Sequence, residues 1–149
     1  MPQVNKAQIT RLNTDDQPRW AELWRGYLTF YKTELPEARY AETWRRIMSD
    51  DGLYGFGARV DGRLVGITHY LFHGSTWADD VCYLQDLFAD PAIRGKGIGR
   101  TLIEAVHAAA QAKGASRLYW LTQDNNTTAR LLYDRLATNR GFIRYDYTG

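Results

Sequence analysis

The sequence is poor in sulfur and imidazole, with a single cysteine, Cys82, and three histidines. One thiol excludes an internal disulfide, and histidines without recognisable ligand spacing predict no metal site. This cysteine usage favours a reducing compartment, so we expect a cytoplasmic location. The sequence also lacks an apolar run long enough to cross a bilayer, and its first residues lack a signal-peptide pattern, so we expect neither membrane insertion nor export.

Lysine is scarce too, with only four lysines among nineteen basic residues. The net charge is +2 and the basic residues do not gather in one segment, so the sequence predicts no nucleic-acid-binding surface. A mild excess of cations suits an anionic cofactor as well. With 149 residues, 44% of them hydrophobic and 24% charged, and no repeat or linker, residues 1–149 are predicted to form a single domain.

Hydrophobic periodicity predicts an alternation of strands and helices. The expected strands span residues 8–12, 54–60, 64–72, 81–89, 117–122 and 141–147. The expected helices span residues 14–31, 36–49, 97–113 and 126–140. The helix between the fourth and fifth strands makes that pair parallel, whereas short turns make the earlier neighbours antiparallel. The prediction is an α/β fold with a mixed sheet flanked by four helices, in the order β-α-α-β-β-β-α-β-α-β.

A turn with three glycines separates the buried strand 81–89 from the helix 97–113. Glycines leave backbone N–H groups open to a ligand, and the helix dipole favours an anion at the same place. The glycines of the turn are Gly95, Gly97 and Gly99, and its cationic residues are Arg94, Lys96 and Arg100. The spacing excludes a Walker loop, and a dinucleotide fingerprint needs glycine where Arg100 stands. The pattern favours pyrophosphate binding, although a tight strand-to-helix connection also explains it.

Residues 94–99, Arg-Gly-Lys-Gly-Ile-Gly, resemble the Arg/Gln-x-x-Gly-x-Gly/Ala signature of the GCN5-related N-acetyltransferase (GNAT) superfamily. The Asp-Pro before the turn and the order of elements are similar too, over nearly the whole chain. The resemblance implies the GNAT fold and acetyl-CoA as co-substrate. It further implies that the backbone of Leu87, Phe88 and Ala89 pairs with the pantetheine arm. The residues implied to hold the pyrophosphate are Arg94, Gly95, Lys96, Gly97, Ile98, Gly99 and Arg100.

A second motif, Asn-x-x-Ala-x-x-x-Tyr, runs from Asn126 to Tyr133 and also resembles the family. Seven helical residues place the two side chains on one face, about 10 Å apart along the axis. The resemblance implies that Asn126 contacts the pantetheine arm and that Tyr133 is the general acid near the sulfur. From the residues alone, Asn126 also fits a helix cap and Tyr133 fits an apolar core face.

An ammonium group must lose a proton before its nitrogen can attack a carbonyl carbon, so a proton acceptor is required. Many relatives have a glutamate on the fourth or fifth strand, but Gln85 and Leu121 stand at those positions. Asp86 is therefore the candidate base, with water, His69 or His73 as relays. An ordinary hydrogen-bonded strand residue is the alternative for each. Cys82 has no recognisable His/Asp partner and is predicted to be a small buried hydrophobe.

The first two helices and their loop carry aromatic and acidic residues that suit a cationic acceptor. The aromatic candidates for acceptor binding are Trp24, Tyr27 and Tyr31, and the acidic ones are Glu34, Glu37, Asp50 and Asp51. A core stripe with a solvated acidic surface is the alternative. Residues 119–122 and 141–145 resemble the histone and polyamine acetyltransferase subgroup, which implies a polyamine, diamine, amino acid or lysine side chain as acceptor.

The sequence thus predicts an N-acetyltransferase in which the amine attacks acetyl-CoA directly within a ternary complex. A non-catalytic acyl-CoA-binding or protein-interaction domain on the same fold is the alternative. Exposed edge strands and an aromatic C-terminal segment also predict a homodimer.

Overall fold

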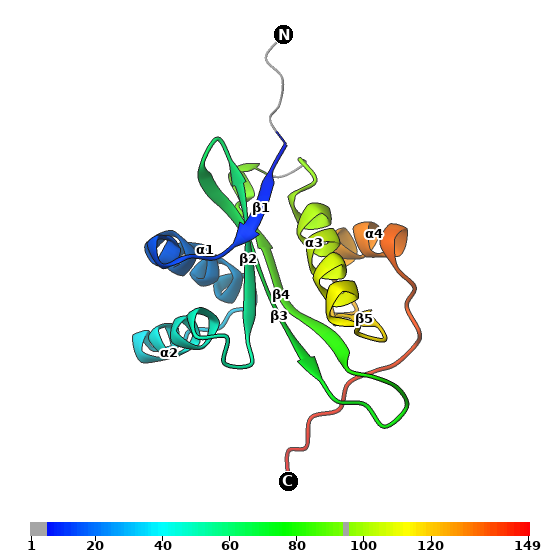
Figure 1. The fold of residues 1–149 in the computed structure, drawn as a ribbon. Coiled ribbons are helices and arrows are strands. Elements are labelled where there is room, and N and C mark those ends of the chain that lie inside the picture. Colours follow the sequence, from blue (N-terminus) through cyan, green and yellow to red (C-terminus); the bar gives the residue numbers. More distant parts are fainter. Residues whose placement is uncertain (1–5, 94–95) are drawn as a thin grey trace.

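The computed structural model describes residues 6–93 and 96–149 and folds them around a mixed sheet between two pairs of helices (Figure 1). In sheet order the strands are β1 (Gln8–Arg11), β2 (Tyr54–Val60), β3 (Arg63–His73), β4 (Val81–Ala89) and β5 (Leu118–Tyr119). Only β4 and β5 pair in parallel. Helices α1 (Gln17–Phe30) and α2 (Glu37–Met48) cover one face, and α3 (Ile98–Lys113) and α4 (Thr127–Leu136) cover the other. Short 3-10 turns, η1 (Thr14–Asp16) and η2 (Pro91–Ile93), precede α1 and α3. The predicted mixed α/β sheet with four flanking helices is confirmed.

Aromatic rings form the core between α1, α2 and the sheet. Trp20 is fully buried, stacks on Trp24 at 5.1 Å between ring centroids, and meets Trp44 of α2 at 4.9 Å. The cluster reaches Ile67 of β3 and Phe88 of β4. Large buried rings contribute most of the apolar area in such a layer, so they hold α1 firmly against β3 and β4.

The opposite layer packs one face of α3 against the sheet. Leu102 and Val106 are fully buried and pack toward the sheet, where Cys82 is also fully buried. Burial raises the pKa of the Cys82 thiol to about 11, so the thiol stays protonated and unreactive at neutral pH. The prediction that Cys82 is a small buried hydrophobe is confirmed.

The C-terminal third differs from the prediction. The expected strand 117–122 shortens to β5, and the expected helix 126–140 ends at Leu136. The expected strand 141–147 is wrong: the structure describes this segment throughout and assigns it no strand, with Phe142 exposed by 87% and Tyr147 by 96%. A strand needs a neighbouring edge, and the two residues of β5 offer too little of one.

Strand β3 and the start of α3 approach each other closely at Gly66. A Cβ atom there would lie 2.7 Å from Ile98 Cγ2 and 3.3 Å from the Phe88 carbonyl oxygen. We therefore expect Gly66→Ala to lower the free energy of unfolding by about 1–3 kcal/mol through overpacking, measured by urea denaturation. Gly74→Ala is the matched control, because a Cβ atom at Gly74 meets nothing within 4 Å. Equal stability of the two variants would contradict this packing account.

Candidate active site

Strand β4 is paired on both sides along only part of its length. Its parallel register with β5 covers Cys82 with Leu118 and Tyr83 with Tyr119, whereas its pairing with β3 continues to Ala89. Backbone groups on the outer edge of β4 beyond Tyr83 therefore lack a partner strand among the described residues and remain able to hydrogen-bond a ligand. Leu87, Phe88 and Ala89, which were singled out from the sequence, lie on this stretch.

A β-bulge turns Asp86 toward α1. His69 pairs with Asp86 and the next residue, Tyr70, pairs with Leu84, so Gln85 is an extra residue in β4. Leu84 packs in the α3 layer, whereas Asp86 contacts His69 on the α1 side. Without the bulge, alternation would put residues 84 and 86 on the same face. The extra residue therefore moves a carboxylate from the α3 side of the sheet to the α1 side.

Asp86 is the end of a buried chain of polar contacts. Trp20 Nε1–H donates to His69 Nε2 over 2.9 Å, and His69 Nδ1 lies 2.8 Å from Asp86 Oδ2. The His69 side chain is 3% exposed and that of Asp86 is 17% exposed, so the carboxylate is at the border between core and solvent. Periodicity placed Trp20 in the core but gave no sign of its hydrogen bond.

Tyrosines gather around the Asp86 carboxylate. Burial raises the pKa of Tyr27 and Tyr31 on α1 and of Tyr83 on β4, and the negative charge of Asp86 raises each of them further. The rings of Tyr27 and Tyr31 lie 4.9 Å apart. All three phenols therefore stay neutral at physiological pH beside an acidic group. Tyr83 is not among the residues predicted from the sequence, because nothing in the sequence distinguishes it from other strand aromatics.

Tyr133 approaches the same place from α4. Burial raises the pKa of its phenol and the neighbouring Tyr31 raises it further, while its ring lies edge-on to Trp120 at 5.4 Å. Tyr31 thus lies near both Asp86 and Tyr133, the two residues predicted to be catalytic. We call Tyr27, Tyr31, Tyr83 and Tyr133 the tyrosine cluster.

The other predicted acceptor residues lie elsewhere. Trp24 is 6% exposed and belongs to the core, and its Nε1 atom has no hydrogen-bond partner within the described part of the chain. Three of the acidic candidates form ion pairs at the surface: Glu37 with Arg25, Asp50 with Arg11 and Asp51 with Arg45. Asp86 is therefore the carboxylate that lies beside Tyr27, Tyr31 and Tyr83.

The glycine turn leads into an uncapped helix. Gly97 has a φ of +71°, and its carbonyl oxygen accepts hydrogen bonds from Thr101 N and Oγ1 at 3.0 and 2.8 Å. Among the described residues no side chain caps α3, so the amides of its first turn are available to an anion. Lys96 is exposed, while Arg100 Nε donates to Glu104 Oε1 at 2.8 Å. Arg94 and Gly95 lie outside the described residues.

The contacts of Asn126 and His73, two further residues predicted to belong to the site, show what each side chain binds. Asn126 precedes α4, but its side chain makes no capping bond and Nδ2 instead donates to Thr122 Oγ1 at 3.4 Å. His73 Nε2 lies 2.9 Å from the Tyr119 hydroxyl. Of the two histidines considered as relays, His69 is therefore the one that contacts Asp86.

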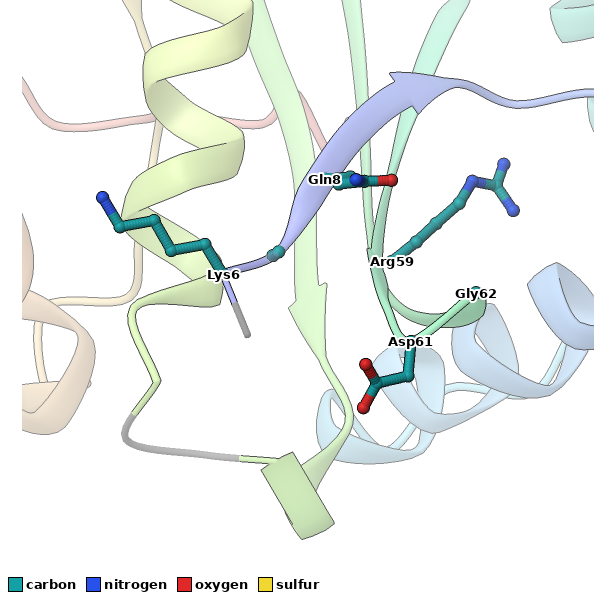
Figure 2. A pocket seen from close by; sticks show the side chains of 6 residues that line it. Lys6, Gln8, Arg59, Asp61 and Gly62 are labelled. Carbon is teal, nitrogen blue, oxygen red and sulfur yellow. The ribbon is translucent and has the colours of Figure 1, made fainter. Parts of the chain in front are cut away.

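A cavity of about 410 Å³ lies at the other edge of the sheet. Figure 2 shows Lys6, Gln8, Arg59, Asp61 and Gly62 lining it, with the cationic ends of Lys6 and Arg59 directed away from each other. Arg59 forms two hydrogen bonds with Asp16, at 2.7 and 2.6 Å. Because the Arg59 guanidinium is already paired with Asp16, it is not free to bind a ligand, and we do not place the active site in this cavity.

Within residues 6–93 and 96–149, no cluster of three His, Cys, Asp or Glu side chains has an arrangement suited to a metal ion. In the same ranges, no helix combines the length and apolarity needed to cross a bilayer.

Comparison with known proteins places this geometry in a family. The model of the Acetyltransferase (GNAT) family matches residues 18–137. The chain is 32% identical to the D-amino-acid N-acetyltransferase of Saccharomyces cerevisiae, covering 95% of this chain and 90% of the relative. It is 30% identical to the thialysine N-epsilon-acetyltransferase of Caenorhabditis elegans, covering 80% and 78%.

Solved structures agree on the fold. A ribosomal-protein-alanine N-acetyltransferase from Brucella melitensis biovar Abortus 2308 superposes with a TM-score of 0.82 and 25% identity, covering 97% of this chain and all of the other. An aminoglycoside N-acetyltransferase in complex with CoA superposes with a TM-score of 0.86 and 21% identity, covering 100% and 98%.

Proposed function

The chain belongs to the acetyltransferase (GNAT) family and is an N-acetyltransferase, and we propose that it moves the acetyl group of acetyl-CoA to a primary amine bound between Asp86 and the tyrosine cluster. The observation that carries this proposal is a carboxylate among neutral phenols, at the point where β4 has an unpaired edge. Such a site combines a proton acceptor, proton donors and unpaired backbone hydrogen-bonding groups in one place.

The residues present fit acetyl-CoA, whose thioester supplies the acetyl group. The unpaired edge of β4 at Leu87, Phe88 and Ala89 offers amides to the pantetheine arm and to the thioester oxygen. The uncapped start of α3 offers further amides to the pyrophosphate, and a relative of the same fold is known in complex with CoA. Asn126 contacts the pantetheine arm. The residues that bind the pyrophosphate are Lys96, Gly97, Ile98, Gly99 and Arg100, together with Arg94 and Gly95, which lie outside the described residues.

The acceptor site favours an ammonium group. Aromatic faces and a carboxylate attract a cation, and Tyr27 and Tyr31 present both next to Asp86. Trp24 supports these rings from the core. The two curated relatives act on amines carried by amino acids, so we favour an amino-acid amine over a polyamine, a diamine or a protein lysine.

The protons balance within a ternary complex. Asp86 takes one proton from the bound ammonium, breaking an N–H bond and forming an O–H bond, so that the nitrogen gains its lone pair. As the N–C bond forms and the C–S bond breaks, the Tyr133 phenol gives its proton to the departing sulfur. Its raised pKa keeps that proton available at neutral pH. The second proton lost by the nitrogen restores the phenol, so one proton leaves the site per turnover, through Asp86.

We further propose a cytoplasmic homodimer. The exposed segment 141–147 carries large apolar side chains that a second copy of the chain can cover: Phe142, Ile143, Tyr145 and Tyr147. A reduced, buried Cys82 suits the cytoplasm.

Incubation with acetyl-CoA and a panel of amines, read by free-thiol release, tests the activity. We expect turnover with D-amino acids to exceed that with spermidine, because the one Asp86 carboxylate beside the tyrosines matches a substrate with one ammonium group. The buried Cys82 thiol contributes little background to the thiol signal. If no amine releases thiol while the folded protein binds CoA, the proposed transfer reaction is wrong.

Gly97→Ala tests the place of the pyrophosphate. Both Gly97 and Gly114 have positive φ, +71° and +81°, at the two ends of α3. Alanine at either position costs about 1 kcal/mol of stability through backbone strain. We expect only Gly97→Ala to weaken CoA binding as well, by about tenfold in calorimetry, because only that end carries the free amides. Equal CoA affinity of the two variants would rule out the α3 start as the anion site.

Tyr133→Phe tests the proton donor. Loss of a general acid lowers the catalytic rate by about 10²-fold, while the retained ring preserves packing and CoA affinity. Tyr54→Phe, which changes a partly buried tyrosine outside the cluster, is the matched control and should keep its rate. If Tyr133→Phe turns over as fast as Tyr54→Phe, Tyr133 is not the acid.

A further inference from the structure

The contacts of Trp20 determine how His69 can be protonated. An indole N–H can only donate, and Trp20 Nε1 lies 2.9 Å from His69 Nε2, so Nε2 must offer its lone pair. The proton of a neutral His69 then lies on Nδ1, where it donates to Asp86 Oδ2 over 2.8 Å. This tautomer is assigned from the hydrogen-bond network, and one arrangement satisfies all three side chains.

The same contacts oppose an imidazolium at His69. A second proton on Nε2 would point at the Trp20 N–H, so a hydrogen bond between two fully or nearly fully buried groups would be lost. The rings that enclose His69 leave little room for another partner: Trp20 lies 6.0 Å and Trp24 6.2 Å away between centroids, both edge-on. A proton that reaches Asp86 therefore has no acceptor behind it.

We propose that His69, held by Trp20 in its Nδ1–H tautomer, is a positioning residue that fixes Asp86 Oδ2 and leaves Oδ1 to take the proton of the acceptor amine. This inference rests on the proposed function, and it assigns His69 the role of a donor in place of a proton relay. In the transfer step one N–H bond of the ammonium breaks and one O–H bond forms on Asp86. The proton leaves from Asp86 to solvent and does not pass through His69.

The backbone supports the same arrangement. Thr68 Oγ1–H donates to the Asp86 carbonyl oxygen over 2.7 Å, directly beside the bulge, so both main chain and side chain of Asp86 are fixed from β3. The ionisable groups that face this pair are Tyr27 and Tyr31 from α1 and Tyr83 from β4, with Tyr133 of α4 beyond Tyr31 and Tyr40 of α2 beyond Trp20. All of these are phenols. The cation that acts on Tyr83 is Arg144, and it pairs with Asp146 at 2.9 Å, so none of these groups replaces the His69 donor.

Nitrogen NMR of the histidine-labelled wild-type protein tests the tautomer without any assay of activity. We expect His69 to show a protonated Nδ1 and a bare Nε2 at neutral pH. In Trp20→Phe, which keeps a ring but removes the N–H, we expect the nitrogen shift of the bare Nε2 to move from its wild-type value, because that nitrogen loses its hydrogen-bond donor. A proton on Nε2 in the wild type, or no change in Trp20→Phe, overturns the inference.

Two substitutions of His69 separate positioning from proton relay. Asparagine keeps a donor near the place of Nδ1 but does not accept a proton in this pH range, whereas leucine removes the donor. We expect His69→Leu to lose about ten- to a hundredfold in kcat/KM for the amine, with the KM for acetyl-CoA unchanged. His69→Asn should recover most of that loss.

The outcomes distinguish this inference from the proposed function. Circular dichroism and CoA binding show whether both variants are folded. If both are folded and His69→Asn is as slow as His69→Leu, His69 transfers protons and the positioning role is wrong. If Asp86→Asn retains full turnover, the assignment of Asp86 as base fails, whatever the tautomer of His69. Should His69→Leu not fold, the NMR comparison of wild type with Trp20→Phe still decides the case.

Discussion

One extra residue in β4 determines on which face of the sheet Asp86 lies. Gln85 has no partner in β3, and the bulge it creates places Leu84 in the layer under α3 and Asp86 in the layer under α1. A carboxylate buried without a hydrogen-bond donor carries the full cost of desolvation. On the α1 side it meets His69, so the bulge is what makes an acidic residue tolerable at this depth.

The aromatic layer therefore has two tasks. It buries enough apolar surface to hold α1 and α2 on the sheet, and Trp20 also supplies the N–H that fixes the buried imidazole. A leucine at position 20 could pack but could not donate. The layer also carries a cost, because the Trp24 N–H is buried without a partner in the described chain, and such a group destabilises a fold by about 1–3 kcal/mol.

The sequence contained the fold but only part of the site. Apolar stripes predicted all four helices, and the glycine and Asn-Tyr motifs led to α3 and Tyr133, because periodicity and motif spacing are local properties. The bulge could not be predicted, because residues 81–89 are nearly all apolar and show no alternation of apolar and polar residues that an extra residue would interrupt. Asp86 was reached by elimination, whereas Tyr83 and the bond of Trp20 depend on contacts between distant segments. Strand 141–147 was wrong, because alternation describes a face and does not supply a partner edge.

The early end of β5 explains how side chains from the two opposite layers come near each other. Helices α1 and α4 lie on different faces of the sheet, so their side chains cannot meet across paired strands (Figure 1). Where pairing stops after Tyr83, Tyr31 from α1 and Tyr133 from α4 come near each other. A longer β5 would continue the ladder and separate them. The unpaired edge of β4 thus lies where side chains from both layers of the fold come near each other, and its free backbone amides face the same place.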